Sequence, residues 1–344
     1  MAISMWILII SIIVVALAFD VINGFHDSAN SIATVVSTRV LSPKYAVLWA
    51  AFFNFVAMFI FVPRVADTIA KIIKINSADS AYVYVVLAGL IGAIAWDLIT
   101  WWLGLPTSSS HALIGGLSGA GIAHAGFSVV RWEKLGETAL FIPLAPLLGF
   151  AIGFGVMIAV YWIFRKWHPM KVDNVFRKGQ LISAALYSLG HGGNDAQKTM
   201  GIIVALLMAA GIFDQNVQLS LFHLNTLWII VGCHLAMAIG TALGGWRIVK
   251  TMGMKITKLK PVNGFSAEVA GAITIFMATF LGVPVSTTHT IAGAIMGVGS
   301  TTNAKEINWL IAGRIVIVWI VTIPASALIA ALFFMVVKLL HPGF

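Results

Sequence analysis

Two polar motifs occur twice in this chain, in the same order, and each lies within or beside a long apolar segment. The sequence GFHDSAN at residues 24–30 returns as GGNDAQK at residues 192–198, and PTSSSH at 106–111 returns as PVSTTH at 284–289. An unsatisfied carboxylate, amide or hydroxyl group in an apolar environment costs several kcal/mol. The four motifs are therefore expected to face one shared polar site.

The composition places this duplicated chain in a membrane. Hydrophobic residues make up 60% of it and charged residues 10%, against about 25% charged residues in a soluble domain. We predict an all-α polytopic membrane protein with two repeats in one membrane domain. The first repeat spans residues 1–164, a short basic connection spans 165–178, and the second repeat spans 179–344.

Ten apolar segments predict about five crossings in each repeat. They span residues 5–38, 45–62, 81–103, 106–128, 138–164, 179–212, 222–246, 261–282, 284–300 and 307–338. An odd number of crossings makes the second repeat enter from the opposite side, so the repeats have inverted topology. Broken helices or re-entrant hairpins are expected at the midplane, where the polar motifs lie. This organisation is typical of secondary transporters.

The basic residues predict the orientation. Residues 165–178 hold five Lys or Arg and one Asp, and residues 247–260 hold five Lys or Arg and no acidic residue. Both stretches are expected in the cytoplasm, so the chain is predicted to be a multi-pass protein of the plasma membrane with both termini on the outer side. Residues 1–20 contain no Lys or Arg and are interpreted as an uncleaved first membrane segment. The net charge of +9 is explained by these connections, so no nucleic-acid partner is expected.

The motifs differ in the local structure they predict. Asn23-Gly24 and residues 190–194 have helix-breaking compositions, so α-helices are expected to unwind there. Pro106 and Pro284 are expected in the first turn of a helix, because proline is tolerated there. The hydroxyl residues that follow would then lie beside free backbone N–H groups at the positive end of the helix dipole.

These groups suit an anion that needs a cation as its partner. Two helix N-termini with Ser and Thr donors fit a tetrahedral oxyanion. Asp27 and Asp195 would repel that anion unless they were protonated or cations lay between them. The anion would therefore bind well only after Na⁺ or H⁺, which couples the two ligands.

The same residues resemble a known family. The chain is similar to the inorganic phosphate transporter family over residues 24–30, 105–116, 190–198 and 284–299. It has His26 where many relatives have Asn, and this form of the motif resembles the bacterial low-affinity branch of the family. The resemblance covers nearly the whole chain. It implies an inverted-repeat phosphate:cation symporter in the lipid bilayer, usually a homodimer, that imports phosphate, free or as a metal complex. It implies no cofactor, and arsenate would act as an analogue.

We assign the candidate residues to three groups. Phosphate is expected to contact hydroxyl and amide side chains of the motifs, namely Ser108, Ser109, Ser110, Ser286, Thr287, Thr288, Asn30, Asn194 and Gln197. The coupling cation is expected at Asp27, Asp195, His26 and Asn23. H⁺ is favoured because an imidazole suits Na⁺ less well than a carbonyl oxygen does, and Na⁺ at Asp27 and Asp195 is the alternative.

A third group has a supporting role for which alternatives stay open. His111 and His289 either orient the hydroxyl residues or pack as neutral rings, and Lys198 forms an ion pair with Asp195 or contacts phosphate. Asp97 is a functional carboxylate or bonds to a neighbouring helix. Glu268 is expected to be buried beside a basic partner. The single cysteine, Cys233, is expected to be a small buried residue.

Two other functions compete with transport. Ser108–Ser110 beside His111 are compatible with an intramembrane phosphatase or hydrolase, but the sequence has no Gly-x-Ser-x-Gly elbow. A channel is less well supported, because deep carboxylates beside anion donors favour co-binding in an occluded site. We therefore predict a secondary transporter and not an enzyme.

Overall fold

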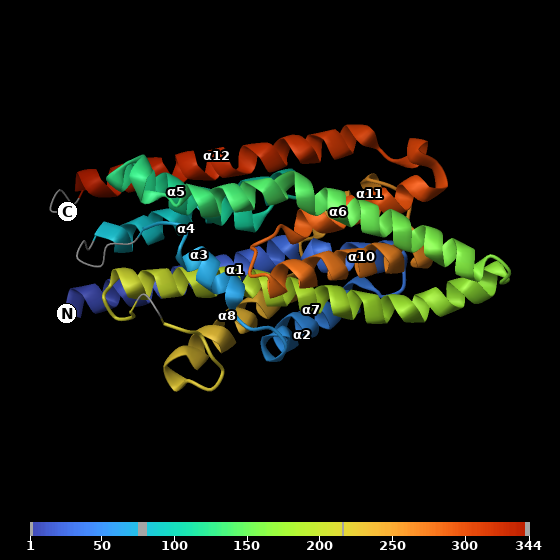
Figure 1. Ribbon diagram of the computed structural model, residues 1–344, viewed down its shortest axis with the longest axis horizontal. Helices are drawn as coiled ribbons and strands as arrows, with labels where there is room; N and C mark the ends of the chain where they lie inside the picture. Colours follow the sequence, from blue (N-terminus) through green and yellow to red (C-terminus); the bar gives the residue numbers. More distant parts are fainter. Residues whose placement is uncertain (1–2, 75–80, 215–216, 341–344) are drawn as a thin grey trace.

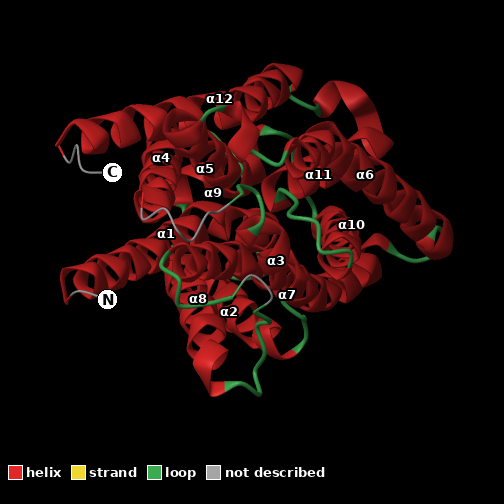
Figure 2. Ribbon diagram, turned by 60° about the vertical axis from the view of Figure 1, so that its left-hand side comes forward, coloured by secondary structure: helices red, strands yellow, loops and turns green. Residues whose placement is uncertain are grey.

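The protein is described by a computed structural model that covers residues 3–74, 81–214 and 217–340. Helices account for the regular secondary structure in these ranges, apart from one isolated bridge between Ile73 and Val130. The predicted all-α class is confirmed (Figure 2).

Twelve α-helices are labelled in chain order through the described ranges. The first half contains α1 (Ile3–Ser37), α2 (Pro43–Val56), α3 (Arg64–Ala70), α4 (Ala81–Leu103), α5 (Ser109–Ala125) and α6 (Trp132–Phe164). The second half contains α7 (Pro169–Ala209), α8 (Leu224–Leu243), α9 (Trp246–Lys250), α10 (Pro261–Phe280), α11 (Thr287–Asn303) and α12 (Trp309–Leu340). Short 3-10 segments are η1 (Ala57–Phe59), η2 (Phe127–Val129) and η4 (Ala304–Glu306), and η3 (Thr251–Lys255) is a π-helix.

The number of membrane-spanning helices differs from the predicted ten. Within the described ranges, α1, α4, α6, α8, α10 and α12 are long and apolar enough to span a membrane, and α2 with α3, bent by 86°, would be a seventh span. The segments predicted at 106–128 and 284–300 form α5 and α11, of 17 residues each. Such a helix rises only about 26 Å, less than the roughly 30 Å of the hydrocarbon core. Helix α7 has 41 residues, but it carries the second polar motif at its centre and is not among these apolar helices.

Two helical hairpins explain the lower number. Helices α4 and α5 pack against each other, and so do α10 and α11. The second helix of each hairpin packs along the last long helix of the other half, since α5 contacts α12 and α11 contacts α6. Helices of the two halves also pack against each other where α1 contacts α8 and α2 contacts α7. Helix α1 begins and α12 ends at the same end of the molecule (Figure 1).

The prediction that α1 and α7 unwind at their motifs is wrong. Both helices continue through the motif, and the glycines there allow close packing. A Cβ atom on Gly24 would lie 2.3 Å from the carbonyl oxygen of Met237, and one on Gly192 would lie 2.4 Å from that of Asn54. Any larger residue would push these helices apart.

The connection between the halves is shorter than predicted. Helix α7 begins at Pro169, so most of the basic stretch 165–178 is helical. Cys233 is buried in α8, as expected. Large apolar side chains such as Leu147 and Trp162 on α6 are exposed, which is the surface that a helix facing lipid requires.

Candidate substrate and cation site

The tips of the two hairpins begin with the same N-cap. Ser108 caps α5 by accepting a hydrogen bond from the backbone N–H of His111 at 3.3 Å, and Ser286 caps α11 by accepting one from His289 at 3.1 Å. The prolines therefore precede the caps and do not occupy the first turn as predicted. The two motifs nevertheless start helices, and their remaining N–H groups face the same region as the hydroxyl side chains.

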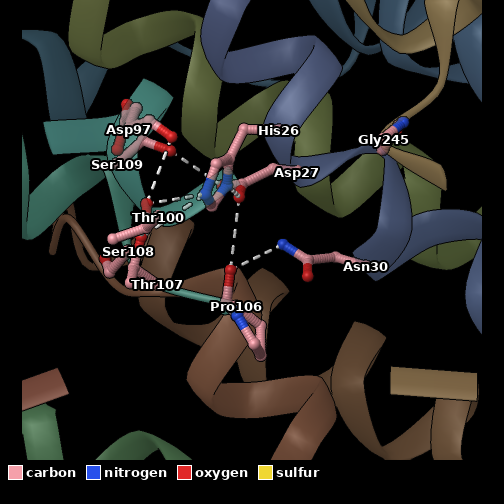
Figure 3. A network of polar contacts seen from close by, with 12 residues as sticks. His26, Asp27, Asn30, Asp97, Thr100, Pro106, Thr107, Ser108, Ser109 and Gly245 are labelled. Atoms are coloured by element: carbon pink, nitrogen blue, oxygen red, sulfur yellow. Dashed lines mark hydrogen bonds and ion pairs between the residues drawn. The ribbon is translucent and has the colours of Figure 1, made fainter. Parts of the chain in front are cut away.

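Asp27 receives donors from both hairpins. Its carboxylate lies 2.8 Å from His26 Nδ1 and accepts a hydrogen bond from Ser109 at 3.2 Å (Figure 3). It accepts another from Thr288 at 3.4 Å. The side chain is 3% exposed. One carboxylate on α1 thus connects α5 with α11.

Asp195 is the corresponding carboxylate on α7. Lys198 Nζ lies 2.5 Å from its Oδ1, Thr287 donates a hydrogen bond to its Oδ2 at 3.3 Å, and His191 Nε2 lies 3.5 Å away. The same ammonium group donates to the carbonyl oxygen of Val285 at 3.2 Å. The predicted ion pair of Lys198 with Asp195 is therefore present.

Further contacts join the two motif pairs. The amide of Asn30 donates to Thr288 at 2.8 Å and to Thr287 at 3.3 Å. Ser110 on the first hairpin donates to the carbonyl oxygen of Val285 on the second at 3.3 Å. The four motifs, far apart in the sequence, meet in one buried place.

The two carboxylates and one imidazole form a group that could hold a metal ion. Ligand atoms of Asp27, His191 and Asp195 all lie within 4.8 Å of one another, and the three residues are buried. Carboxylate oxygens suit a hard cation such as Na⁺, whereas an imidazole nitrogen suits a transition metal. His191 was not among the predicted site residues, although its position four residues before Asp195 places both on one helix face.

Two residues predicted to contact phosphate, Gln197 and Asn194, also have protein partners. The Gln197 amide oxygen accepts from Val65 N at 2.8 Å, and its nitrogen donates to the carbonyl oxygen of Gly193 at 2.7 Å. The Asn194 amide donates to Thr279 at 2.9 Å. These bonds hold α3 and the end of α10 against α7.

Glu268 is buried, but its expected basic partner is not found. Thr34 donates to it at 2.6 Å, Gln180 at 2.9 Å and Ser183 at 2.5 Å. Among the described residues the ion pairs do not include Glu268. Three neutral donors replace the predicted base.

Two other supporting residues, His111 and Asp97, have buried polar atoms without a hydrogen-bond partner in the described part of the chain. His111 and His289 lie with ring centroids 4.9 Å apart, and neither nitrogen of His111 has a hydrogen-bond partner among the described residues. Packing is therefore the observed alternative for His111. Asp97 is 0% exposed, and its carboxylate makes no hydrogen bond within the described part of the chain. The alternative of a bond to a neighbouring helix is not observed.

Sequence comparison identifies the family. The profile of the phosphate transporter family matches residues 23–330. The chain belongs to this family. It is 52% identical over 325 residues to a probable low-affinity inorganic phosphate transporter of Rhizobium meliloti (strain 1021), covering 94% of this chain and 95% of the relative. A relative of the same name from Bacillus subtilis (strain 168) is 45% identical, with 97% and 98% covered.

A solved structure agrees with this family assignment. The chain matches the structure of a protein named the sodium-dependent phosphate transporter with a TM-score of 0.87 and 25% identity, covering 96% of this chain and 99% of that one. The predictions of the phosphate transporter family, of its bacterial low-affinity relatives and of a transporter instead of an enzyme are confirmed. As a family member with at least six apolar helices, the chain is a multi-pass membrane protein.

Proposed function

We propose that this protein imports inorganic phosphate by symport with a cation, with alternating access around the site between the hairpins. One observation carries the proposal: hydroxyl groups from both hairpin tips converge on Asp27 and Asp195 in a buried place. The family relationship supports phosphate as the substrate.

Phosphate would replace the carboxylates as the acceptor of these hydrogen bonds. Ser109 and Thr288 donate to Asp27, and Thr287 donates to Asp195. When the hydroxyl groups turn to phosphate oxygens, Ser108, Ser110, Ser286 and Asn30 would add donors from the same helix ends. Asn194 and Gln197 would act less directly, by holding α7 in place.

When the hydroxyl groups donate to phosphate, Asp27 and Asp195 lose these donors, and the cation would then neutralise the two carboxylates. We favour H⁺, because His26 lies 2.8 Å from Asp27 and an imidazole gains or loses a proton near physiological pH. Na⁺ between Asp27 and Asp195 is the alternative, and it is supported by the sodium dependence in the name of the structurally similar transporter. Either cation reduces the repulsion that phosphate would otherwise meet.

Two inverted repeats, residues 1–164 and 179–344, would give alternating access. The exchanged packing of α5 on α12 and of α6 on α11 supports this symmetry. The charge of residues 165–178 and 247–260 supports termini on the outside of the plasma membrane. We further propose a homodimer, on the family resemblance alone.

Reconstitution in liposomes tests the function. Radiolabelled phosphate uptake is measured with a pH gradient and a Na⁺ gradient imposed separately, with liposomes that lack the protein as the control. Uptake should follow the pH gradient, and arsenate should compete whereas sulfate, which carries no proton near neutral pH, should compete poorly. Uptake that follows neither gradient would contradict symport. Uptake that follows the Na⁺ gradient alone would identify Na⁺, and not H⁺, as the coupling cation.

A further inference from the structure

Helix α3 of the first half holds the tip of the α10–α11 hairpin of the second half. Arg64 Nη1 donates to the carbonyl oxygen of Phe280 at 2.7 Å, and Thr68 Oγ1 donates to that of Gly282 at 2.8 Å. These carbonyl groups lie at the C-terminal end of α10, where the helix offers them no N–H partner and its dipole is negative. We call this pair of bonds the Arg64 clasp.

The second half holds the tip of the α4–α5 hairpin in the same way. Arg247 Nη1 donates to the carbonyl oxygen of Trp102 at 2.7 Å, and Thr251 Oγ1 donates to that of Gly104 at 2.9 Å. Donors and acceptors have the same spacing as in the Arg64 clasp, and in both hairpins the second acceptor precedes the proline of the motif by two residues. We call this pair the Arg247 clasp. The two clasps are equivalent in the two halves.

Each clasp is also bonded to a helix that carries a carboxylate of the site. The backbone N–H of Val65 donates to Gln197 at 2.8 Å, two residues after the aspartate of α7. The backbone N–H of Gly245 donates to Ser28 at 2.5 Å, one residue after the aspartate of α1. Each clasp therefore connects one carboxylate helix with the tip of one hairpin.

The held tips cover the candidate phosphate site. Ser109 and Thr287, which donate to the two carboxylates, each follow the glycine of their hairpin tip by five residues and are 1% exposed. Both clasps are formed in this structure, so the site is closed. Phosphate can reach these hydroxyl groups only when one tip moves away from the helix that holds it. Two permanent helix caps would keep the site closed.

The clasps face opposite sides of the membrane in the proposed orientation. The α4–α5 hairpin lies at the end of the molecule that holds the termini, and the α10–α11 hairpin lies towards the other end (Figure 1). A cavity of about 710 Å³ is lined by Arg64, Thr68 and Gly282 together with residues of α7. Arg247 belongs to the basic stretch 247–260 that is expected in the cytoplasm.

We propose that the Arg64 clasp is the outer gate and the Arg247 clasp the inner gate, and that they open one at a time. The inference rests on the proposed alternating access and names the residues that control it. The Arg247 guanidinium also lies 5.0 Å from the ring centroid of Trp101 and 4.5 Å from that of Trp102, whereas Arg64 has no such contact among the described residues. These contacts strengthen the inner gate.

Cysteine labelling of the full-length protein in membranes tests the gates without measuring transport. The background is Cys233→Ala. Val285→Cys is the outer reporter and Thr107→Cys is the inner reporter; each follows the glycine of a hairpin tip by three residues, and both native side chains are 0% exposed. A membrane-impermeant maleimide is added to whole cells for the outer reporter and to inside-out vesicles for the inner reporter.

Weakening one clasp should move the two reporters in opposite directions. Arg64→Gln and Thr68→Val should each raise the labelling rate of the outer reporter roughly tenfold, because a bond that holds the gate closed is lost. They should lower the rate of the inner reporter, because the two open states exclude each other. Arg247→Gln and Thr251→Val should have the reverse effects. The two threonine variants remove only a hydroxyl group and keep the test decisive where an arginine variant does not fold.

Arg177→Gln is the matched control. Arg177 donates to the carbonyl oxygen of Arg39 at 2.7 Å, the same kind of bond away from the hairpin tips, so its loss should leave both rates unchanged. Faster labelling of both reporters in the clasp variants would show a general loosening and would overturn the proposal, as would unchanged rates in all four. Failure of the proposed function would be seen separately, as absent phosphate uptake by wild-type liposomes.

Discussion

Replacing Lys198 by Met should strongly destabilise the protein. The Lys198 side chain is 1% exposed, and its ammonium group lies 2.5 Å from Asp195 and donates to the carbonyl oxygen of Val285. Methionine keeps the apolar part of the side chain, so the change removes mainly the charge. Among the described residues, Asp195 would then retain the hydroxyl group of Thr287 at 3.3 Å and the more distant ring of His191.

The expected loss is about 3–5 kcal/mol of unfolding free energy, the usual cost of leaving one partner of a buried ion pair alone. The double variant Lys198→Met/Asp195→Asn should recover much of it, because no uncompensated charge stays buried. A double-mutant cycle from denaturant titrations in detergent micelles measures both values.

Lys134 provides a matched control. It forms an ion pair with Glu137 at 2.9 Å with the same spacing of three residues, but the two side chains are 35% and 47% exposed. Lys134→Met should cost less than about 1 kcal/mol, since water screens an exposed pair. Equal losses for Lys198→Met and Lys134→Met, or additive losses in the cycle, would refute the argument from burial.

Three further predictions concern transport. Asp27→Asn and Asp195→Asn should each abolish gradient-driven phosphate uptake, the first without loss of folding and the second with the loss of stability expected for an unpaired Lys198. Normal uptake by either would limit that carboxylate to a structural role. Ser109→Ala and Thr287→Ala should weaken phosphate binding by about 1–3 kcal/mol in calorimetric titrations; unchanged affinity in both would place phosphate elsewhere. His26→Asn should reduce uptake driven by a pH gradient, and an unchanged response would argue for Na⁺ coupling.

The convergence of the four motifs could be predicted because polar groups in apolar segments need partners. Asp27, Ser109 and Thr287 lie in different helices, yet the cost of leaving each unpaired already required a common site. The repeated order of the motifs also indicated which segments would meet. Hydrogen bonds from both hairpins to Asp27 agree with that expectation.

The paths of the helices were harder to predict, because glycine has two opposite roles. Gly24 was interpreted as a helix breaker from its low helix propensity. In the folded protein it lies in a continuous helix and allows contact with the backbone at Met237. Only a neighbouring helix distinguishes these roles, and no local pattern shows which helix that is.

Hairpins could not be distinguished from crossings for a similar reason. The segments that became α5 and α11 are continuous in the sequence and were interpreted as crossings, but each forms a helix of only 17 residues that packs on the helix before it. Arg64 and Arg247 were not assigned a role, because they lie outside the four motifs. The return of RVADT at residues 64–68 as RIVKT at 247–251 was the available signal.

The two halves of the chain differ most where their carboxylates meet a base. Asp27 contacts the imidazole of His26, which can gain or lose a proton near physiological pH, whereas Asp195 contacts the side-chain nitrogen of Lys198. Phosphate arriving between them would compete with Asp195 for the Lys198 nitrogen. It would meet a positive charge beside Asp27 only when His26 is protonated. Under the proposed symport with H⁺, the proton would therefore act through His26 and Asp27 in the first half of the chain.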